Sequence, residues 1–235
     1  MNNILLCGFF KSFHKVFIED NRWQLYLQGM ANTLVMSLIA IFIGIFIGLL
    51  ISIIKNIHIN TGKLAILDKI GDLYVTIIRG VPMMLQLYIM YFVVLSGINV
   101  PILIASIAFG INSGAYTAET FRAGIFSVDK GQMEAGRSLG LSYPKTMAKV
   151  IIPQALKNAI PPLGNEFIAL IKETAIVGSI GIIDLTKAAN KITGPTFEAF
   201  LPLAIAAVFY LIIVLSLTQL MKYIERRLSR SDKRN

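Results

Sequence analysis

The chain has 235 residues, of which 55% are hydrophobic and only 15% are charged. A soluble domain holds about 45–50% apolar and about 25% charged residues, so this composition and a mean hydropathy of +0.69 favour lipid as the solvent. The net charge of +9 does not indicate a nucleic-acid partner, because the basic residues lie between apolar runs. The single cysteine, Cys7, excludes an internal disulfide, and the two distant histidines argue against a metal site.

Residues 1–22 combine basic and aromatic side chains. Lys11, Lys15 and Arg22 are interspersed with phenylalanines at near-helical spacing. We expect an interfacial helix whose aromatic side chains face lipid. These are Phe9, Phe10, Phe13 and Phe17. We find no signal peptide, so the first spanning helix is expected to direct insertion.

A transmembrane domain is predicted over residues 23–223. A membrane-spanning helix needs about 20 mostly apolar residues. The predicted spans are a first at 23–54, a second and a third within 80–118, a fourth near 162–183 and a fifth at 199–221. A turn at 96–101 separates the second span from the third. The fourth span is the weakest, because it carries Glu166, Lys172 and Glu173.

The basic residues orient these spans. The loops after the first and third spans and the tail at 224–235 are rich in lysine and arginine. The turn after the second span has no basic residue, and the other loop on that side has only Lys187 and Lys191. The positive-inside rule therefore predicts an outer N-terminus and a cytoplasmic C-terminus. The basic residues of segment 1–22 argue mildly against this orientation.

The loop at about 128–155 has the pattern of two short helices joined by a sharp turn. Gly140 can end the first helix in a left-handed conformation. Ser142 can cap the second helix, with Pro144 in its first turn. We expect this second helix to stop near Pro153. From the residues alone, an ordinary loop is an equal alternative.

The same loop resembles the EAA loop of ABC importer permeases. That loop follows the pattern Glu-Ala-Ala, three residues, Gly, nine residues, Ile-x-Leu-Pro. The matching residues are Glu134, Ala135, Gly136, Gly140 and 150–153, with Gly136, Val150 and Ile152 as mild departures. In that family a short helix of the loop docks onto the ATPase subunit. The resemblance therefore implies that this chain is coupled to an ATPase through Glu134, Ala135, Gly136, Gly140 and Pro153.

Other stretches are similar to the permeases of polar amino-acid importers of the histidine, glutamine and arginine type. They lie at 29–34, 78–87, 114–125 and 172–181, so that the similarity covers about 23–222. The resemblance implies an all-α integral protein of the bacterial cytoplasmic membrane, of the type I ABC importer kind. It implies five transmembrane helices and a cytoplasmic EAA-type coupling helix. The partners it implies are ABC ATPase subunits, a second permease as a homo- or heterodimer, an extracytoplasmic solute-binding protein and an amino acid substrate.

The chain lacks a nucleotide site of its own. Its one candidate for a phosphate-binding loop, at 61–64, has no upstream glycine and no Ser or Thr after the lysine. We therefore expect no cofactor on this chain and no enzymatic activity, with ATP and Mg²⁺ on the partner ATPase. The expected mechanism is alternating access driven by that ATPase.

Ionisable residues within a span are costly and mark functional sites. A rise of about 1.5 Å per residue puts Arg79 and Glu119 near the cytoplasmic edge, where they are expected to pair. Lys172 falls near mid-membrane if the fourth span begins near Pro162. The predicted solute pathway consists of Arg79, Gln86, Asn112, Tyr116, Glu119 and Lys172.

Structural roles compete with these assignments. The charges can instead lie at the membrane interface, and Gln86 and Asn112 can form a hydrogen bond between packed helices. Gly44 and Gly48 form a Gly-xxx-Gly pattern that suggests a close helix contact in the first span. Two other functions stay open at this point: a membrane channel or scaffold without an ATPase, and an ABC permease for another solute.

Overall fold

The structure is a computed structural model that describes residues 2–232, with side chains described for residues 8–228. Every regular element in this part of the chain is helical. The α-helices are α1 (Asn2–Phe13), α2 (Trp23–Thr61), α3 (Ala65–Gly80), α4 (Met83–Ile89), α5 (Pro101–Phe126), α6 (Lys130–Ser138), α7 (Tyr143–Thr146), α8 (Ile152–Glu173), α9 (Leu185–Thr196) and α10 (Phe200–Asp232).

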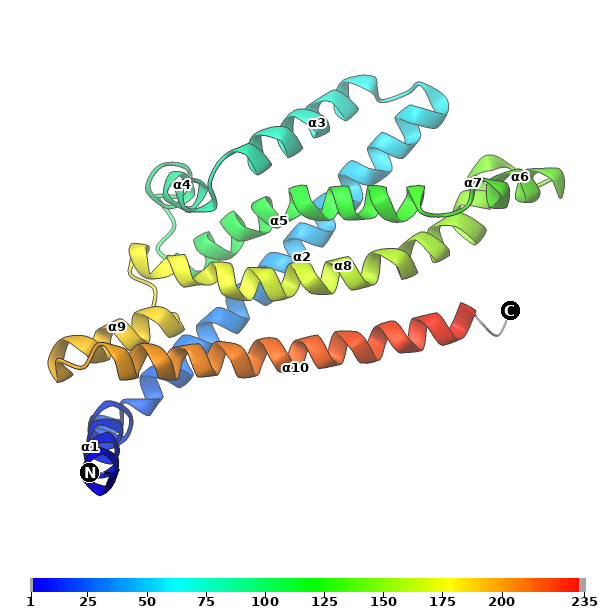
Figure 1. The fold of residues 1–235 in the computed structure, drawn as a ribbon. Helices are drawn as coiled ribbons and strands as arrows, with labels where there is room; N and C mark the ends of the chain where they lie inside the picture. Colours follow the sequence, from blue (N-terminus) through cyan, green and yellow to red (C-terminus); the bar gives the residue numbers. More distant parts are fainter. Residues whose placement is uncertain (1, 233–235) are drawn as a thin grey trace.

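The long helices form one bundle. Helices α5, α8 and α10 run side by side, and α2 crosses them obliquely (Figure 1). Helices α6 and α7 lie at one end, near the C-terminal end of α10, whereas α1 and α9 lie at the other (Figure 1). Residues 224–232 of the predicted tail continue α10 as a helix, and residues 233–235 lie outside the described part.

Within the described residues, three helices are long and apolar enough to cross a membrane by themselves. They are α2, α5 and residues 200–228 of α10. Helix α3 and the segment 83–94 qualify together, as one span bent by 109°. Helix α8 has 22 residues but carries the charges noted in the sequence. The helical fold class is therefore confirmed, and a count of five depends both on α8 and on the bent pair forming one span.

The predicted second span begins at a break in the helix, and the residues before it, predicted as part of a loop, form α3. Helix α3 ends at Gly80, and Pro82, which has no N–H to donate, precedes α4. The side-chain amide of Gln86 donates to the carbonyl oxygens of Ile78 and Val81 at 2.7 and 2.8 Å. These hydrogen bonds satisfy carbonyl groups that the bend releases, so the break is a built feature of the fold.

The predictions for Pro153 and Pro162 are wrong. A π-helical turn, Met147–Ile151, joins α7 to α8 without interruption, and Pro153 lies in the first turn of α8. Because Pro153 follows the π-helical turn directly, the N–H that a proline lacks falls where the regular i to i−4 hydrogen-bond pattern is already interrupted. Pro161 and Pro162 lie inside α8, so neither begins a span.

Helices α2 and α5 pack at very short distance. A Cβ atom at Gly44 would lie 2.7 Å from Ser113 Oγ, and one at Gly48 would lie 2.7 Å from the backbone nitrogen of Ala118. The hydroxyl of Thr117 donates to the Gly44 carbonyl oxygen at 2.6 Å. The close contact suggested by the Gly-xxx-Gly pattern is therefore confirmed.

The N-terminal segment packs on α9 and α10. Lys15 Nζ donates to the Thr196 carbonyl oxygen at 2.7 Å, and Ser12 Oγ donates to Glu198 Oε1 at 3.0 Å. Phe17 packs against the core that surrounds buried Tyr26. The prediction that all four phenylalanines face lipid is therefore wrong for Phe17. Phe9 and Phe10 are exposed.

Candidate functional site

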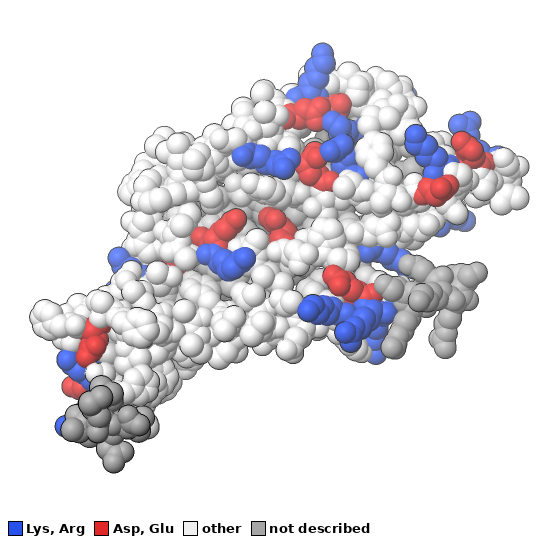
Figure 2. Space-filling model, in the orientation of Figure 1, with Lys and Arg blue, Asp and Glu red and all other residues white. Residues whose placement is uncertain are grey.

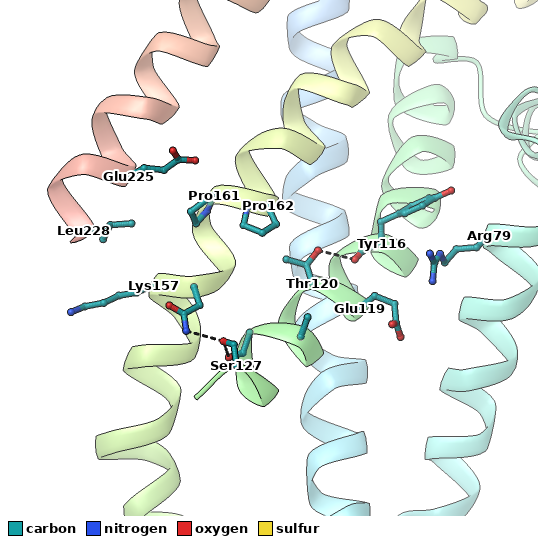
Figure 3. A pocket seen from close by; sticks show the side chains of 13 residues that line it. Arg79, Tyr116, Glu119, Thr120, Ser127, Lys157, Pro161, Pro162, Glu225 and Leu228 are labelled. Atoms are coloured by element: carbon teal, nitrogen blue, oxygen red, sulfur yellow. Dashed lines mark hydrogen bonds between the residues drawn. The ribbon is translucent and has the colours of Figure 1, made fainter. Parts of the chain in front are cut away.

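A cavity with a volume of about 820 Å³ lies between α3, α5, α8 and α10 (Figure 3). Its lining residues are Arg79, Tyr116, Glu119, Thr120, Ala123, Gly124, Ser127, Lys157, Asn158, Pro161, Pro162, Glu225 and Leu228. It therefore contains three of the six predicted pathway residues, Arg79, Tyr116 and Glu119.

Arg79 and Glu119 do not form the ion pair that was predicted for them. Glu119 accepts from Arg122 Nε at 3.2 Å, one turn further along α5, and the two form an ion pair. The guanidinium carbon of Arg79 lies 5.3 Å from the centre of the Tyr116 ring. Such a cation–π contact holds the arginine across the space between α3 and α5 at the cavity (Figure 3).

Helix α8 supplies a polar wall that was not predicted from the sequence. Pro161 and Pro162 cannot donate to the carbonyl oxygens of Lys157 and Asn158, four residues earlier. These four residues all line the cavity. The amide of Asn158 also donates to Ser127 Oγ at 2.8 Å (Figure 3). A pair of prolines within an otherwise helical stretch was the available signal.

The remaining pathway candidates lie elsewhere. Asn112 donates to Gln86 Oε1 at 3.2 Å, and both side chains are buried between α4 and α5. These two residues hold helices together, as the structural alternative predicted. Lys172 is the second-last residue of α8, about 30 Å along the helix from Ile152. The mid-membrane depth predicted for Lys172 assumed a span that starts near Pro162, and α8 instead starts ten residues earlier, at Ile152.

Helix α8 presents charges on its surface. Lys172 and Glu173 are exposed, and Glu166 is partly exposed. Figure 2 shows acidic and basic side chains gathered over the middle of the visible face, apart from the charges at the α6–α7 end. An exposed charge on a membrane helix faces water or another protein rather than lipid.

The α6–α7 segment, residues 128–151, has the predicted helix–turn–helix form. Asp129 caps α6, with its carboxylate accepting from the Gly131 nitrogen at 2.7 Å. Gly140 has φ +81°, and the Leu141 nitrogen donates back to the Gly136 carbonyl oxygen at 3.1 Å. This is the left-handed glycine termination that the sequence indicated.

The second helix differs in one detail from the prediction. Pro144 lies in the first turn of α7, as predicted, and Ser142 occupies the N-cap position. The side chain of Ser142 makes no capping hydrogen bond.

The motif residues divide into a buried and an exposed set. A Cβ at Gly136 would lie 2.5 Å from Thr146 Cγ2, and Thr146 is fully buried. The family pattern has alanine at this position, and the contact with Thr146 explains why glycine replaces it here. Glu134 and Ala135 are exposed, and Leu139 at the turn is 83% exposed. Pro153 lies on α8, outside this surface.

Residues 40–230 match the family model for the binding-protein-dependent transport system inner membrane component. The chain belongs to this family. It is 40% identical to "Putative glutamine transport system permease protein GlnP" of Rickettsia bellii, over 86% of this chain and 92% of that protein. It is 42% identical to "Arginine transport system permease protein ArtQ" of Bacillus subtilis, over 69% of this chain and 76% of that protein.

The fold has a solved counterpart. The structure described as "Crystal structure of an amino acid ABC transporter with histidines" superposes with a TM-score of 0.80 at 40% identity, covering 87% of this chain and 94% of that chain. The family predicted from the EAA-like loop is thus confirmed, and the type I importer permease fold with it. Family membership also argues against the channel or scaffold alternative.

Proposed function

We propose that this chain is the permease subunit of an ATP-driven importer for a polar amino acid. The observation that carries the proposal is the exposed α6–α7 segment on a membrane-spanning fold of this family. This segment exposes three side chains to a partner, those of Glu134, Ala135 and Leu139. Its shape is fixed by Gly136 and Gly140. The names of the relatives, which concern glutamine and arginine, favour an amino acid over an inorganic anion or a peptide.

In this proposal α2, the broken pair formed by α3 and segment 83–94, α5, α8 and α10 are the five spans. Helices α6 and α7 face the cytoplasm, as does the C-terminal end of α10, because basic residues gather there. The opposite end, with α1 and α9, faces outward to a solute-binding protein. Helix α1 and the C-terminal end of α10 lie at opposite ends of the bundle, which supports an odd number of spans (Figure 1).

The solute pathway is assigned to the 820 Å³ cavity and to the charged face of α8. The cavity opens between helices and offers both signs of charge, from Arg79 and Glu119, to a zwitterionic solute. The exposed Lys172 and Glu173 are then covered by a second permease, with water between the two subunits. Gln86 and Asn112 keep a structural role beside the pathway.

The chain supplies no ATPase chemistry in this scheme. A partner ATPase with its ATP and Mg²⁺ docks on the α6–α7 segment. Closure of two ATPases moves the two segments toward each other, and the spans then open outward. Hydrolysis resets the cavity toward the cytoplasm. Each half of the cycle exposes the pathway to one side only, which is alternating access.

The test is purification of the chain from native membranes in mild detergent, with mass spectrometry of the co-purifying proteins. We expect an ABC ATPase with the unaltered chain and its loss with Gly140→Asp, because an aspartate side chain is strained at φ +81°. Gly97→Asp is the matched control, since a Cβ added to this glycine, in the turn before α5, would meet nothing within 4 Å and its φ is not positive. Absence of any ATPase from the unaltered chain would contradict the proposal.

A further inference from the structure

The cytoplasmic end of α2 contacts two separate parts of the molecule through consecutive residues. The hydroxyl of Tyr143 in α7 donates to Asn56 Oδ1 at 2.9 Å. The neighbouring Lys55 forms an ion pair with Asp72 of α3, and its Nζ lies 3.7 Å from Asp68 Oδ1. The last turns of α2 therefore connect the α6–α7 segment to α3.

A second cavity lies beside the hydrogen bond between Tyr143 and Asn56 and makes that bond important. It has a volume of about 200 Å³ and lies between α2, the end of α5 and the α6–α7 segment. Ile59 lines it from α2, and Met133 and Met147 line it from the segment. Because apolar contact is interrupted here, the polar contact carries much of the connection. Among the described side chains, Tyr143 to Asn56 is the hydrogen bond that joins α7 to α2.

The other side of α2 leads to the larger cavity. Helix α3 runs without a break from Ala65 to Gly80 and carries Arg79 at its far end. A displacement applied near Asp68 and Asp72 therefore moves Arg79 relative to Tyr116, the ring on which it lies. A continuous line of contacts thus joins the exposed α6–α7 segment to the wall of the pathway cavity.

We propose that Tyr143 and Asn56 are positioning residues that transmit movement of the α6–α7 segment to α2, and through Lys55 to α3 and Arg79. This relay rests on the proposed function, since an ATPase supplies the movement. Burial raises the pKa of the Tyr143 phenol, so the hydroxyl keeps its proton at neutral pH and remains the donor.

The experiment uses the whole assembly of permease, ATPase and binding protein in proteoliposomes. Three quantities are measured: co-purification of the ATPase, the ATPase rate and the uptake of labelled amino acid. With Tyr143→Phe or Asn56→Leu, we expect unchanged co-purification and about fivefold less uptake per ATP hydrolysed, the effect on an equilibrium of losing one neutral hydrogen bond. Asn56→Asp keeps an acceptor and should keep the ratio.

The matched controls are Tyr223→Phe and Asn99→Leu. Tyr223 is exposed on α10, and Asn99 is exposed in the turn before α5, away from the α6–α7 segment. Both controls should keep the unaltered ratio. The double variant Tyr143→Phe/Asn56→Leu should be no worse than either single variant, because both remove the same contact.

Two results overturn the relay while leaving the proposed function in place. An equal fall of ATPase rate and uptake in Tyr143→Phe, at an unchanged ratio, would show a structural role alone. Additive losses in the double variant would show that Tyr143 and Asn56 act separately. If no ATPase co-purifies with the unaltered chain, the proposed function is wrong and the relay falls with it. The co-purification measurement distinguishes this case from the other two.

Discussion

The two faces of α5 differ in how much room they leave. On the α2 side, a Cβ at Gly110 or Gly114 would lie within 3 Å of side-chain atoms of Ile43 or Ile47, so the helices are in contact along several turns. On the opposite side, α5 borders the 820 Å³ cavity. Close packing resists displacement, whereas a cavity leaves the neighbouring helices free to shift. We infer that α2 and α5 form one rigid pair and that the room for movement lies at the level of the cavity.

The largest effect is expected from filling the tight face. In Gly48→Ala the new methyl group meets the backbone at Ala118, which has no alternative rotamer. We expect a loss of about 1–3 kcal/mol of stability, the usual cost of overpacking. Gly97→Ala in the turn before α5, where an added Cβ would meet nothing within 4 Å, is the control. Thermal unfolding in detergent measures both, and equal stability of the two variants would contradict a rigid α2–α5 pair.

The next effect concerns the link between α4 and α5. Gln86→Leu removes the donors to the carbonyl oxygens at the α3–α4 break, and Asn112→Leu removes the donor to Gln86. Each variant is expected to lose about 1–3 kcal/mol, because a buried polar group is left unpaired. The double variant should lose less than the sum. Unchanged stability with altered substrate preference would instead place these residues in the pathway.

A smaller effect is expected within the α6–α7 segment. Gly136→Ala, which restores the family's usual residue, introduces a methyl group against Thr146 Cγ2. We expect a loss of roughly 1 kcal/mol and weaker ATPase co-purification. Thr146→Ser removes the opposing methyl group, so Gly136→Ala/Thr146→Ser should recover most of the loss. If the double variant is as weak as Gly136→Ala, the steric explanation is wrong.

The smallest stability effect is expected at the cavity. The Glu119–Arg122 ion pair is partly exposed, so Glu119→Gln should cost no more than about 1 kcal/mol. Arg79→Gln should also leave thermal unfolding nearly unchanged, while uptake in proteoliposomes falls. Arg79→Lys keeps the charge without the planar stacking group and should be intermediate in uptake. Full uptake by Arg79→Gln would remove this residue from the pathway.

Local signals predicted local structure well. The Gly140 termination and Pro144 in the first turn of α7 follow from the conformational limits of glycine and proline, which hold regardless of the rest of the fold. The charge-free stretches likewise predicted α2, α5 and α10, because lipid demands about 20 apolar residues wherever the helix lies.

Features that depend on tertiary contacts were not predictable. The hydrogen bonds from Gln86 that satisfy the break before α4 join atoms made neighbours by the fold. The course of α8 through Pro153, Pro161 and Pro162 depends on a π-helical turn and on neighbouring helices. Arg79 and Glu119 were expected to pair by depth, but Glu119 pairs with Arg122 and Arg79 lies against the Tyr116 ring, which depth alone does not show.

The most direct measurement is uptake of labelled glutamine and arginine by proteoliposomes that hold this chain with its co-purified ATPase and binding protein. We predict uptake that requires both ATP and binding protein and is abolished by Gly140→Asp, with Gly97→Asp retaining it. Flux that is independent of ATP, or uptake unaffected by Gly140→Asp, would contradict the account of this chain as an ATPase-coupled permease.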